Sequence, residues 1–373
     1  MNKKIIFVCV FVCLISLTAF VSGVKAQSAG AIFINSDGSV SGTSMIQRDG
    51  NIYRLTGNLY DMPIVVLRNN IVLDGEGFAL QGAGGWGTAG VAGVETTSAI
   101  NLTCSNVTVR NFNINGWEVG ILGSYNGNTI INNNITATER AIAIYADNYI
   151  VTSNYLANSI YGVRILGNNI SIQQNQIVNN WYGFLISSSS GVIIAGNNIA
   201  NNNIAVNTDN MPPSSFQVYL NNFVNDANAT IVSTTSDALG FGGGGTLSPW
   251  DNGTTGNYWS DYATKYPNAN EIGNTGIGDT PYLIHVNPTV IDRYPLMTPV
   301  AIQNITLPSP SQTSTTSLST TVSPSPTSSP NPSHSMLEIT LIATLVLAMV
   351  LCIVVLVFRK KLFWLQKEST KIS

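Results

Sequence analysis

Residues 128–147 read NTIINNNITATERAIAIYAD, and residues 148–167 read NYIVTSNYLANSIYGVRILG. Each segment contains two short alternations of apolar and polar residues, separated by a polar turn. Alternation with a period of two over a few residues is typical of a β-strand. Because short strands that return at a fixed period indicate stacked repeats rather than a globular core, these two segments decide the fold.

One asparagine in each repeat marks the period. It stands at Asn133, Asn154, Asn175, Asn197 and Asn221, at gaps of 21, 21, 22 and 24 residues. We interpret this column as a structural ladder at a bend between strands, where each amide bonds the amide of the next coil and tolerates a left-handed backbone. Phe112 occupies the equivalent position one coil earlier, so the ladder is expected to begin at Asn133.

The remainder of each repeat predicts a parallel β-helix. The second alternation opens with a small residue, which is Gly120, Ala141, Gly162 or Gly183 in four successive repeats. A leucine-rich horseshoe is the alternative, but its L-x-x-L-x-L pattern is absent. Stacked coils place equivalent residues about 4.8 Å apart, so a residue that returns in every repeat forms a column along the axis.

The two ends of the chain predict export and anchoring. Residues 1–26 combine two lysines, an apolar run and a Val-x-Ala site, so we expect a cleaved signal peptide, with an uncleaved anchor as the alternative. Residues 336–358 are expected to form a transmembrane helix, because their apolar run can cross about 30 Å of hydrocarbon. The basic tail, residues 359–373, would stay in the cytoplasm, which places the body of this single-pass protein outside the cell membrane.

Four regions are expected between these ends. Residues 27–69 are the predicted N-terminal cap, residues 70–240 the coils and residues 241–302 the C-terminal cap. Caps are expected because the open ends of a β-helix expose strand edges. Residues 303–335 are rich in Ser, Thr and Pro and have few apolar side chains to bury, so they predict an extended stalk.

The composition of the predicted exported body limits its partners. Residues 27–335 carry 17 acidic and 8 basic residues, and this acidic excess argues against nucleic acid. Only Cys104 remains in this region, so no intramolecular disulfide is possible there. Seven Asn-x-Ser/Thr sequons suit an exported glycoprotein. They begin at Asn101, Asn106, Asn134, Asn169, Asn228, Asn252 and Asn304.

A strip of aromatic and charged residues surrounds the start of the second alternation in four successive repeats. It contains Trp117, Glu118, Glu139, Arg140, Tyr161, Arg164, Trp181 and Tyr182. Aligned by period, Glu118 and Glu139 are one coil apart, and Trp181 continues their column. Aromatic rings stack on the apolar faces of sugar rings, while Glu and Arg bond their hydroxyls. The strip is therefore the candidate site for a polysaccharide or a cell-surface glycan.

Three functions remain open for this surface. We favour binding of a polysaccharide or surface glycoconjugate without turnover. The alternative is a polysaccharide-active hydrolase or lyase, because Glu118 and Glu139 at one-coil spacing come near the ~5–5.5 Å of a retaining glycosidase pair. The third is a structural or adhesive envelope protein, on whose solvated surface Arg140 and Arg164 would merely offset the carboxylates.

The segment after the coils carries the most specific motifs. They are WDNG at residues 250–253, GNYWSDY at 256–262, GIGDTPY at 276–282 and DRYPL at 292–296. With the repeat, over residues 70–297, they resemble archaeal NosD-type β-helix proteins, a group described as carbohydrate-binding or sugar-hydrolysis (CASH) domains. The resemblance implies an all-β, right-handed parallel β-helix of about 21–24 residues per coil with terminal caps, here followed by one transmembrane helix. It also implies a carbohydrate partner.

Metal binding receives little support from the residues present. Many relatives carry more Asp before the GIGD motif, which would suit Ca²⁺; here Glu271 and Asp279 are the candidates. The family name also carries a copper association, and copper selects imidazole and soft sulfur donors. The exported body offers two histidines, His285 and His334, one cysteine and four scattered methionines. We therefore predict no cofactor.

Overall fold

The computed structural model describes residues 30–84, 98–209, 216–233, 250–285, 289–302, 305 and 307–310. The predicted signal peptide, transmembrane helix and cytoplasmic tail lie outside these residues, as does most of the predicted stalk. Within the described ranges, no helix is long and apolar enough to cross a membrane.

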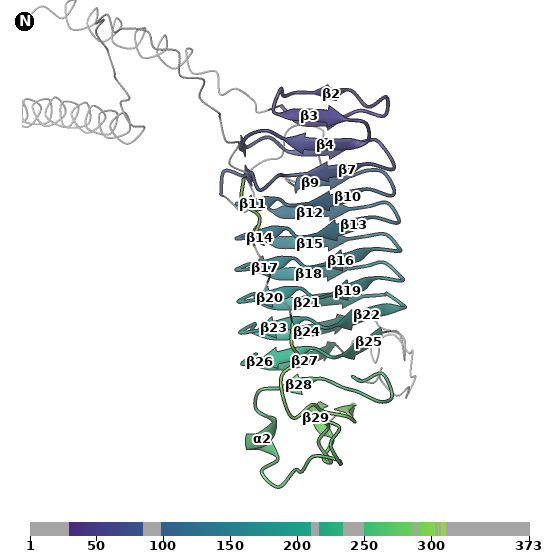
Figure 1. Ribbon diagram of the computed structural model, residues 1–373, viewed down its shortest axis with the longest axis vertical. Coiled ribbons are helices and arrows are strands. Elements are labelled where there is room, and N and C mark those ends of the chain that lie inside the picture. Colours follow the sequence, from purple (N-terminus) through teal and green to yellow (C-terminus); the bar gives the residue numbers. More distant parts are fainter. Residues whose placement is uncertain are drawn as a thin grey trace, which may run out of the picture. The chain divides into compact units, whose positions relative to one another are not determined.

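Three parallel β-sheets form the walls of a solenoid (Figure 1). We name the three sheets A, B and C in the order in which the chain enters them. Each complete coil contributes one strand to each sheet. Seven complete coils run from β6 to β26. Because crossovers between parallel strands are right-handed in nearly all proteins, this all-β architecture agrees with the right-handed parallel β-helix expected from the repeat and the resemblance.

The strands are two to six residues long. Sheet A contains, in spatial order, β2 (Val40–Ser41), β1 (Ile32–Ile34), β6 (Ile64–Val66), β9 (Ser98–Leu102), β12 (Val119–Gly123), β15 (Arg140–Ile144), β18 (Tyr161–Ile165), β21 (Tyr182–Ser187), β24 (Ile204–Asp209) and β27 (Asn228–Ser233). Sheet B contains β25 (Phe216–Tyr219), β22 (Val192–Ala195), β19 (Ser171–Gln173), β16 (Ile150–Thr152), β13 (Thr129–Ile131), β10 (Thr108–Arg110), β7 (Val72–Asp74), β4 (Ile52–Leu55) and β3 (Ile46–Asp49). Sheet C contains β28 (Tyr258–Trp259), β26 (Asn222–Val224), β23 (Asn198–Ala200), β20 (Gln176–Val178), β17 (Tyr155–Ala157), β14 (Asn134–Thr136), β11 (Asn113–Asn115), β8 (Ala79–Gln81) and β5 (Leu59–Tyr60).

The N-terminal end combines parallel and antiparallel pairing. Strands β1 and β4 pair in parallel with β6 and β7 of the first complete coil. Strands β2 and β3 add antiparallel partners to β1 and β4. Parallel stacking therefore begins inside residues 27–69, and the antiparallel strands cover the edges of sheets A and B that an open solenoid would expose.

The pairing register follows the repeat that the sequence predicts. Ile130 pairs with Val151 in sheet B, and Ile135 pairs with Leu156 in sheet C, each across 21 residues. These side chains face the interior and have no exposed surface. Burial of an aliphatic side chain contributes about 1.5–3 kcal/mol, so the interior columns hold the coils together without disulfides.

The asparagine ladder forms as predicted, with one correction. The side-chain amide of Asn133 donates to Oδ1 of Asn154 over 3.0 Å, and the pattern continues through each later member. The backbone N–H of Phe112 donates to Oδ1 of Asn133, which confirms where the ladder begins. The expectation of a left-handed backbone at the ladder asparagines is wrong, because the positive φ lies one residue earlier, at Asn132 and Ser153 for example. The ladder residue itself turns its amide inward.

The C-terminal cap closes the solenoid with aromatic rings. β28 pairs with β26, and the ring of Trp259 stacks between Phe223 and Tyr282, with centroids 4.4 and 4.2 Å apart. A short helix, α2 (Tyr262–Lys265), and the antiparallel pair β29 (Tyr282–His285) and β30 (Val290–Asp292) complete the cap. The apolar interior is thus covered at the end where the coils stop.

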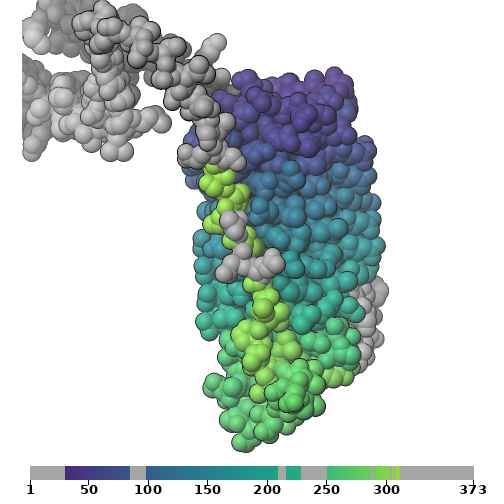
Figure 2. All heavy atoms as spheres, viewed as in Figure 1, coloured from purple at the N-terminus to yellow at the C-terminus, as the bar shows by residue number. Residues whose placement is uncertain are grey.

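After the cap, the chain returns along sheet C. Val300 exchanges two backbone hydrogen bonds with the side chain of Asn222 on β26, at 2.8 and 3.0 Å. Further on, the side chain of Asn113 on β11 donates to the carbonyl oxygen of Pro308 over 2.8 Å. These contacts are five coils apart, or about 24 Å, which eight extended residues can span. Figure 2 shows this segment, in green to yellow, crossing the teal coils. The first residues assigned to the stalk therefore contact the solenoid.

Candidate functional site

The candidate strip lies at the bend that leads from sheet C into sheet A. Arg140, Tyr161 and Tyr182 are paired in register at the starts of β15, β18 and β21, as the period predicts. Just before them, the carbonyl oxygen of Glu118 accepts the backbone N–H of Glu139 over 3.0 Å. The predicted alignment of these columns over neighbouring coils is thus confirmed.

Arg140 is the centre of the charged part of the strip. Its Nη2 lies 2.8 Å from Oε1 of Glu118, and its Nε lies 3.4 Å from Oε1 of Glu139. Nη1 donates to the hydroxyl of Tyr145 over 3.2 Å. Burial acts to lower the pKa of Arg140, but the bond to Tyr145 and the two carboxylates outweigh it and raise the pKa. The guanidinium therefore stays charged and holds both carboxylates.

The aromatic part of the strip is more open. Trp181 exposes 57% of its surface. The rings of Tyr161 and Tyr182 stack with their centroids 5.1 Å apart and their planes 8° from parallel. Stacking in adjacent coils fixes both rings, because the backbone register sets the spacing. The strip therefore combines one exposed ring with an ordered, half-buried pair.

Arg164 adjoins the strip on the outer face of sheet A. It is paired in register with Ala143 and Leu185, as the period predicts. Its guanidinium lies over the ring of Tyr145, 5.7 Å from the centroid. The Nε of Arg164 is buried and has no hydrogen-bond partner among the described residues. A small outward-facing apolar cluster of Val119, Leu122 and Ala143 packs against Tyr145 on the same face.

Two residues change the predicted composition of the strip. Trp117 is 7% exposed, belongs to the hydrophobic core and donates its indole N–H to the carbonyl oxygen of Leu80 over 3.0 Å. It is therefore not part of the exposed surface. Tyr145, which is not among the residues predicted for the strip, links Arg140 to Arg164. Counting two residues on from the outward-facing Ala143 would have placed Tyr145 on this face.

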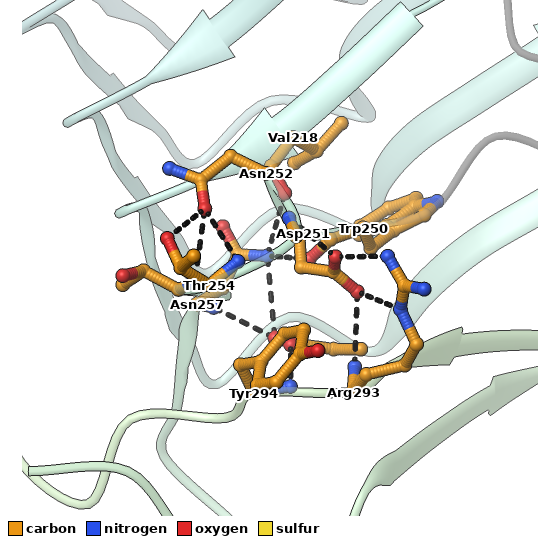
Figure 3. A network of polar contacts seen from close by, with 11 residues as sticks. Val218, Trp250, Asp251, Asn252, Thr254, Asn257, Arg293 and Tyr294 are labelled. Carbon is orange, nitrogen blue, oxygen red and sulfur yellow. Dashed lines mark hydrogen bonds and ion pairs between the residues drawn. The ribbon is translucent and has the colours of Figure 1, made fainter.

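The motifs of the C-terminal cap form a second polar cluster (Figure 3). The side chain of Asp251 has no exposed surface. Its Oδ2 accepts Nε of Arg293 over 2.9 Å, and its Oδ1 accepts the backbone N–H of Gly253 over 2.9 Å. Burial acts to raise the pKa of Asp251, but the hydrogen bonds from Arg293 and Gly253 outweigh it and lower the pKa.

A second aspartate of the cap ends the asparagine ladder. The amide of Asn221 donates to Oδ1 of Asn257 over 2.9 Å, and the backbone N–H of Asn257 donates to Oδ2 of Asp292 over 2.7 Å. The indole N–H of Trp259 reaches the same oxygen over 2.9 Å. Burial raises the pKa of Asp292 to about 6, although these donors act against it. The motif residues of the cap therefore have structural partners.

The calcium candidates stabilise turns within the cap. Oε1 of Glu271 accepts the backbone N–H of Gly276 over 2.7 Å, and Oδ1 of Asp279 accepts the backbone N–H of Asn270 over 3.1 Å. The hydrogen bond from Asn270 is the largest cause of a lowered pKa at Asp279. In the described ranges, no group of three His, Cys, Asp or Glu residues is placed to hold a metal ion.

The copper-type donors of the described chain are dispersed. Cys104 is buried, and its Sγ lies 3.2 Å from the carbonyl oxygens of Val66 and Arg68. Burial raises the pKa of Cys104 to about 11. A thiol that stays protonated and inside the coils is a poor copper ligand, because the thiolate is the ligand. The residues in these ranges do not fit a copper site.

No curated protein sequence matches the chain. Among solved structures, the enzymatically active domain of Bacteriophage CBA120 tailspike protein 2 is similar with 15% identity and a TM-score of 0.32, over 57% of this chain and 38% of that one. The A-module of Azotobacter vinelandii mannuronan C-5 epimerase AlgE6 is similar with 15% identity and a TM-score of 0.29, over 56% and 83%. This chain thus spans well under half of the tailspike domain.

The family comparison is more extensive. A family model described as "Periplasmic copper-binding protein (NosD)" matches residues 64–264. These residues include all seven complete coils, from β6 to β26, and the GNYWSDY motif of the cap. The match covers more than half of the 373 residues, and the chain belongs to the NosD family.

Proposed function

We propose that the strip binds a polysaccharide or a surface glycoconjugate without turning it over. The observation that carries this proposal is the exposed ring of Trp181 beside the stacked pair of Tyr161 and Tyr182. Exposure of an apolar indole to water is unfavourable, and the exposed face makes no packing contact within the fold. A sugar ring that stacks on this face would remove it from water. The tyrosines add a fixed apolar edge with two hydroxyls.

The shape of the strip suits an extended ligand. Its residues are spread over four neighbouring coils, which at about 4.8 Å per coil gives a length of about 14 Å along the axis. Rings and guanidinium groups held by a solenoid lose little conformational entropy on binding. A chain of sugars that lies parallel to the axis would meet an aromatic or charged group at each coil.

Arg164 is the group most suited to select a ligand. Its Nε is buried and has no hydrogen-bond partner within the described residues, and an N–H in that state costs about 1–3 kcal/mol. Nε itself is buried, but Arg164 as a whole is partly exposed, so a hydroxyl or carboxylate of the glycan would meet the charge of its guanidinium rather than Nε. Charge-assisted bonds are about twice as strong as neutral ones, so we expect acidic sugars to bind more tightly than neutral ones.

A hydrolase or lyase remains the alternative. Glu118 and Glu139 lie on adjacent coils, which is the placement that a pair of catalytic carboxylates needs. Both, however, share the guanidinium of Arg140. This arrangement favours a binding role, because the carboxylates are engaged with Arg140 rather than with a substrate. A purely structural or adhesive role remains the third hypothesis.

Copper does not enter the proposal. The family is named for copper binding, but the donors in the described ranges do not fit a copper site, so no step is assigned to the metal. Export, the membrane anchor, the extracellular position of the β-helix and an archaeal source stay predictions from the sequence, as do the domain boundaries.

The test measures retention and product together. The detergent-solubilised full chain is run through gels that contain single polysaccharides, while new reducing ends and unsaturated sugars are assayed in parallel. We expect slower migration in at least one acidic polysaccharide and no product. Product formation that Glu139→Gln abolishes would replace binding by catalysis, and unchanged migration in every polysaccharide would favour the structural hypothesis.

A further inference from the structure

Asn252, in the WDNG turn of the C-terminal cap, differs from the sequon asparagines Asn106, Asn134 and Asn169 in the state of its amide. Its side chain is exposed, and its Oδ1 accepts three hydrogen bonds, from the backbone N–H groups of Thr254 and Thr255 and from the Thr254 hydroxyl, at 2.8–3.0 Å. Its Nδ2 donates no hydrogen bond to the described residues. Figure 3 shows this nitrogen turned away from the cluster.

The other sequon amides within the coils are less available. Nδ2 of Asn134 donates to Oδ1 of Asn113 over 3.0 Å, and Oδ1 of Asn134 is buried. Nδ2 of Asn106 and Nδ2 of Asn169 also donate to asparagines of the preceding coil. Asn101 is half-buried in β9. The side chains of the two remaining sequon asparagines lie outside the described part of the chain.

The turn that carries Asn252 is fixed by the hydrogen bonds of the preceding residue, Asp251. Asp251 is buried and bonded to Arg293 and to the backbone N–H of Gly253. Gly253 has a φ of 93°, and a side chain added there would meet no atom within 4 Å. The turn therefore presents the exposed side chain of Asn252 on a fixed base, and the neighbouring position at Gly253 has open space beside it.

We propose that Asn252, in the sequon Asn252-Gly253-Thr254, accepts an N-linked glycan in the folded protein. The donor is a lipid-linked oligosaccharide. A bond forms between Nδ2 and the anomeric carbon of the first sugar, the bond from that carbon to the phosphate of the lipid breaks, and the amide nitrogen loses one proton. The lipid phosphate leaves with the bonding electrons. This inference concerns the cap and does not depend on glycan binding by the strip.

The experiment compares folded and unfolded acceptors. The solubilised full chain is incubated with an oligosaccharyltransferase and its lipid-linked oligosaccharide, and each sequon is quantified by mass spectrometry of its glycopeptides. Synthetic peptides that cover residues 248–258 and 130–140 serve as unfolded references. Because the amide of Asn252 needs no local opening, we expect its rate in the folded chain to stay within about 3-fold of its peptide, whereas Asn134 should be at least about 100-fold slower than its peptide.

Variants separate the acceptor from its surroundings. Asn252→Gln and Thr254→Ala should each abolish the glycan on residue 252, and Thr254→Ser should retain it, because a hydroxyl remains at the third position of the sequon. Asn134→Gln should leave the modification of Asn252 unchanged. An unmodified Asn252 in a folded chain whose peptide is readily glycosylated, or a folded chain that accepts its glycan at Asn134, would overturn the proposal.

Discussion

The polar cluster of the C-terminal cap and the strip on sheet A use the same kinds of side chain in opposite ways. In the cap, the buried carboxylate of Asp251 meets the guanidinium of Arg293 and the N–H of Gly253. In the strip, Arg164 buries an N–H that has no partner among the described residues, and Trp181 exposes more than half of its surface. Aromatic, acidic and basic residues in a motif therefore do not by themselves mark a site.

The difference lies in how completely the polar groups are satisfied. Buried polar groups in native proteins are nearly always hydrogen-bonded, so an exception needs an explanation. The polar cluster of the cap contains no such exception, because its aspartates and its ladder amide are hydrogen-bonded within the fold. The strip does, because the buried Nε of Arg164 has no partner among the described residues and the exposed ring of Trp181 is free for a ligand to cover. The most specific sequence motifs therefore support the fold, and the less regular strip is the better candidate for function.

The largest effect is expected when a charge in the cap loses its partner. Arg293→Ala leaves the carboxylate of Asp251 buried without its cation, so the free energy of unfolding should fall by about 3 kcal/mol. Arg164→Ala in the strip should change it by less than about 1 kcal/mol in either direction, because the lost packing is offset by removal of an unpartnered N–H. Denaturant titration followed by fluorescence measures both variants. If both variants lose the same free energy of unfolding, the cap and the strip do not differ in how strongly their charged groups stabilise the fold.

A smaller effect is expected from titration of Asp292. Its pKa is raised from 3.8 to about 6 in the folded state, so the folded protein holds this proton more tightly than the unfolded chain does. The resulting stabilisation is complete below about pH 3.8 and is lost as the pH rises through 6. Between pH 4 and pH 8, the contribution of Asp292 to the free energy of unfolding should therefore fall by about 3 kcal/mol at most.

The pH effect is isolated by a difference measurement. The unfolding of the wild type and of Asp292→Asn is followed from pH 4 to pH 8, and the gap between them is plotted against pH. Asp49→Asn is the control, because Asp49 lies at the exposed N-terminal end of the solenoid. A gap that stays constant across this range would contradict the role of burial at Asp292.

Trp181→Ala should separate binding from stability. Removal of an exposed ring that forms the centre of a binding surface typically costs about 1–2 kcal/mol, so affinity for a retained glycan should fall about 10-fold. The free energy of unfolding should change by less than about 0.5 kcal/mol. Tyr60→Ala is the matched control, because Tyr60 is 60% exposed but lies outside the strip. Equal losses of affinity in the two variants would indicate non-specific adhesion.

The smallest expected effect concerns selectivity. Arg164→Gln keeps a hydrogen-bond donor and removes the charge, so binding of an acidic glycan should weaken about 5-fold while binding of a neutral glycan changes little. Isothermal titration at low and high salt measures this difference. If acidic and neutral glycans lose affinity alike, Arg164 contributes packing rather than charge.

The sequence predicted the coils better than it predicted the bends. The period aligned Glu118 with Glu139 and set the start of the ladder, because register in a solenoid is fixed by its interior columns. Trp117, a candidate of the strip, is buried instead, because the turn before each small residue interrupts the alternation and the sequence does not show which way a side chain faces there. The step from Asn221 to Asn257 was missed because 36 residues separate them, well beyond one period.

Oxidative footprinting of the full chain, with and without a retained glycan, tests the central claim most directly. Hydroxyl radicals label exposed aromatic side chains, and mass spectrometry reports each labelled residue separately. The controls are Tyr60 and Tyr125, which are 60% and 51% exposed and lie outside the strip, and they are compared with Trp181 and Tyr182. The glycan should protect Trp181 and Tyr182 and leave Tyr60 and Tyr125 unchanged. Protection at Tyr60 or Tyr125 with none at Trp181 would contradict the assignment of the strip as the binding surface.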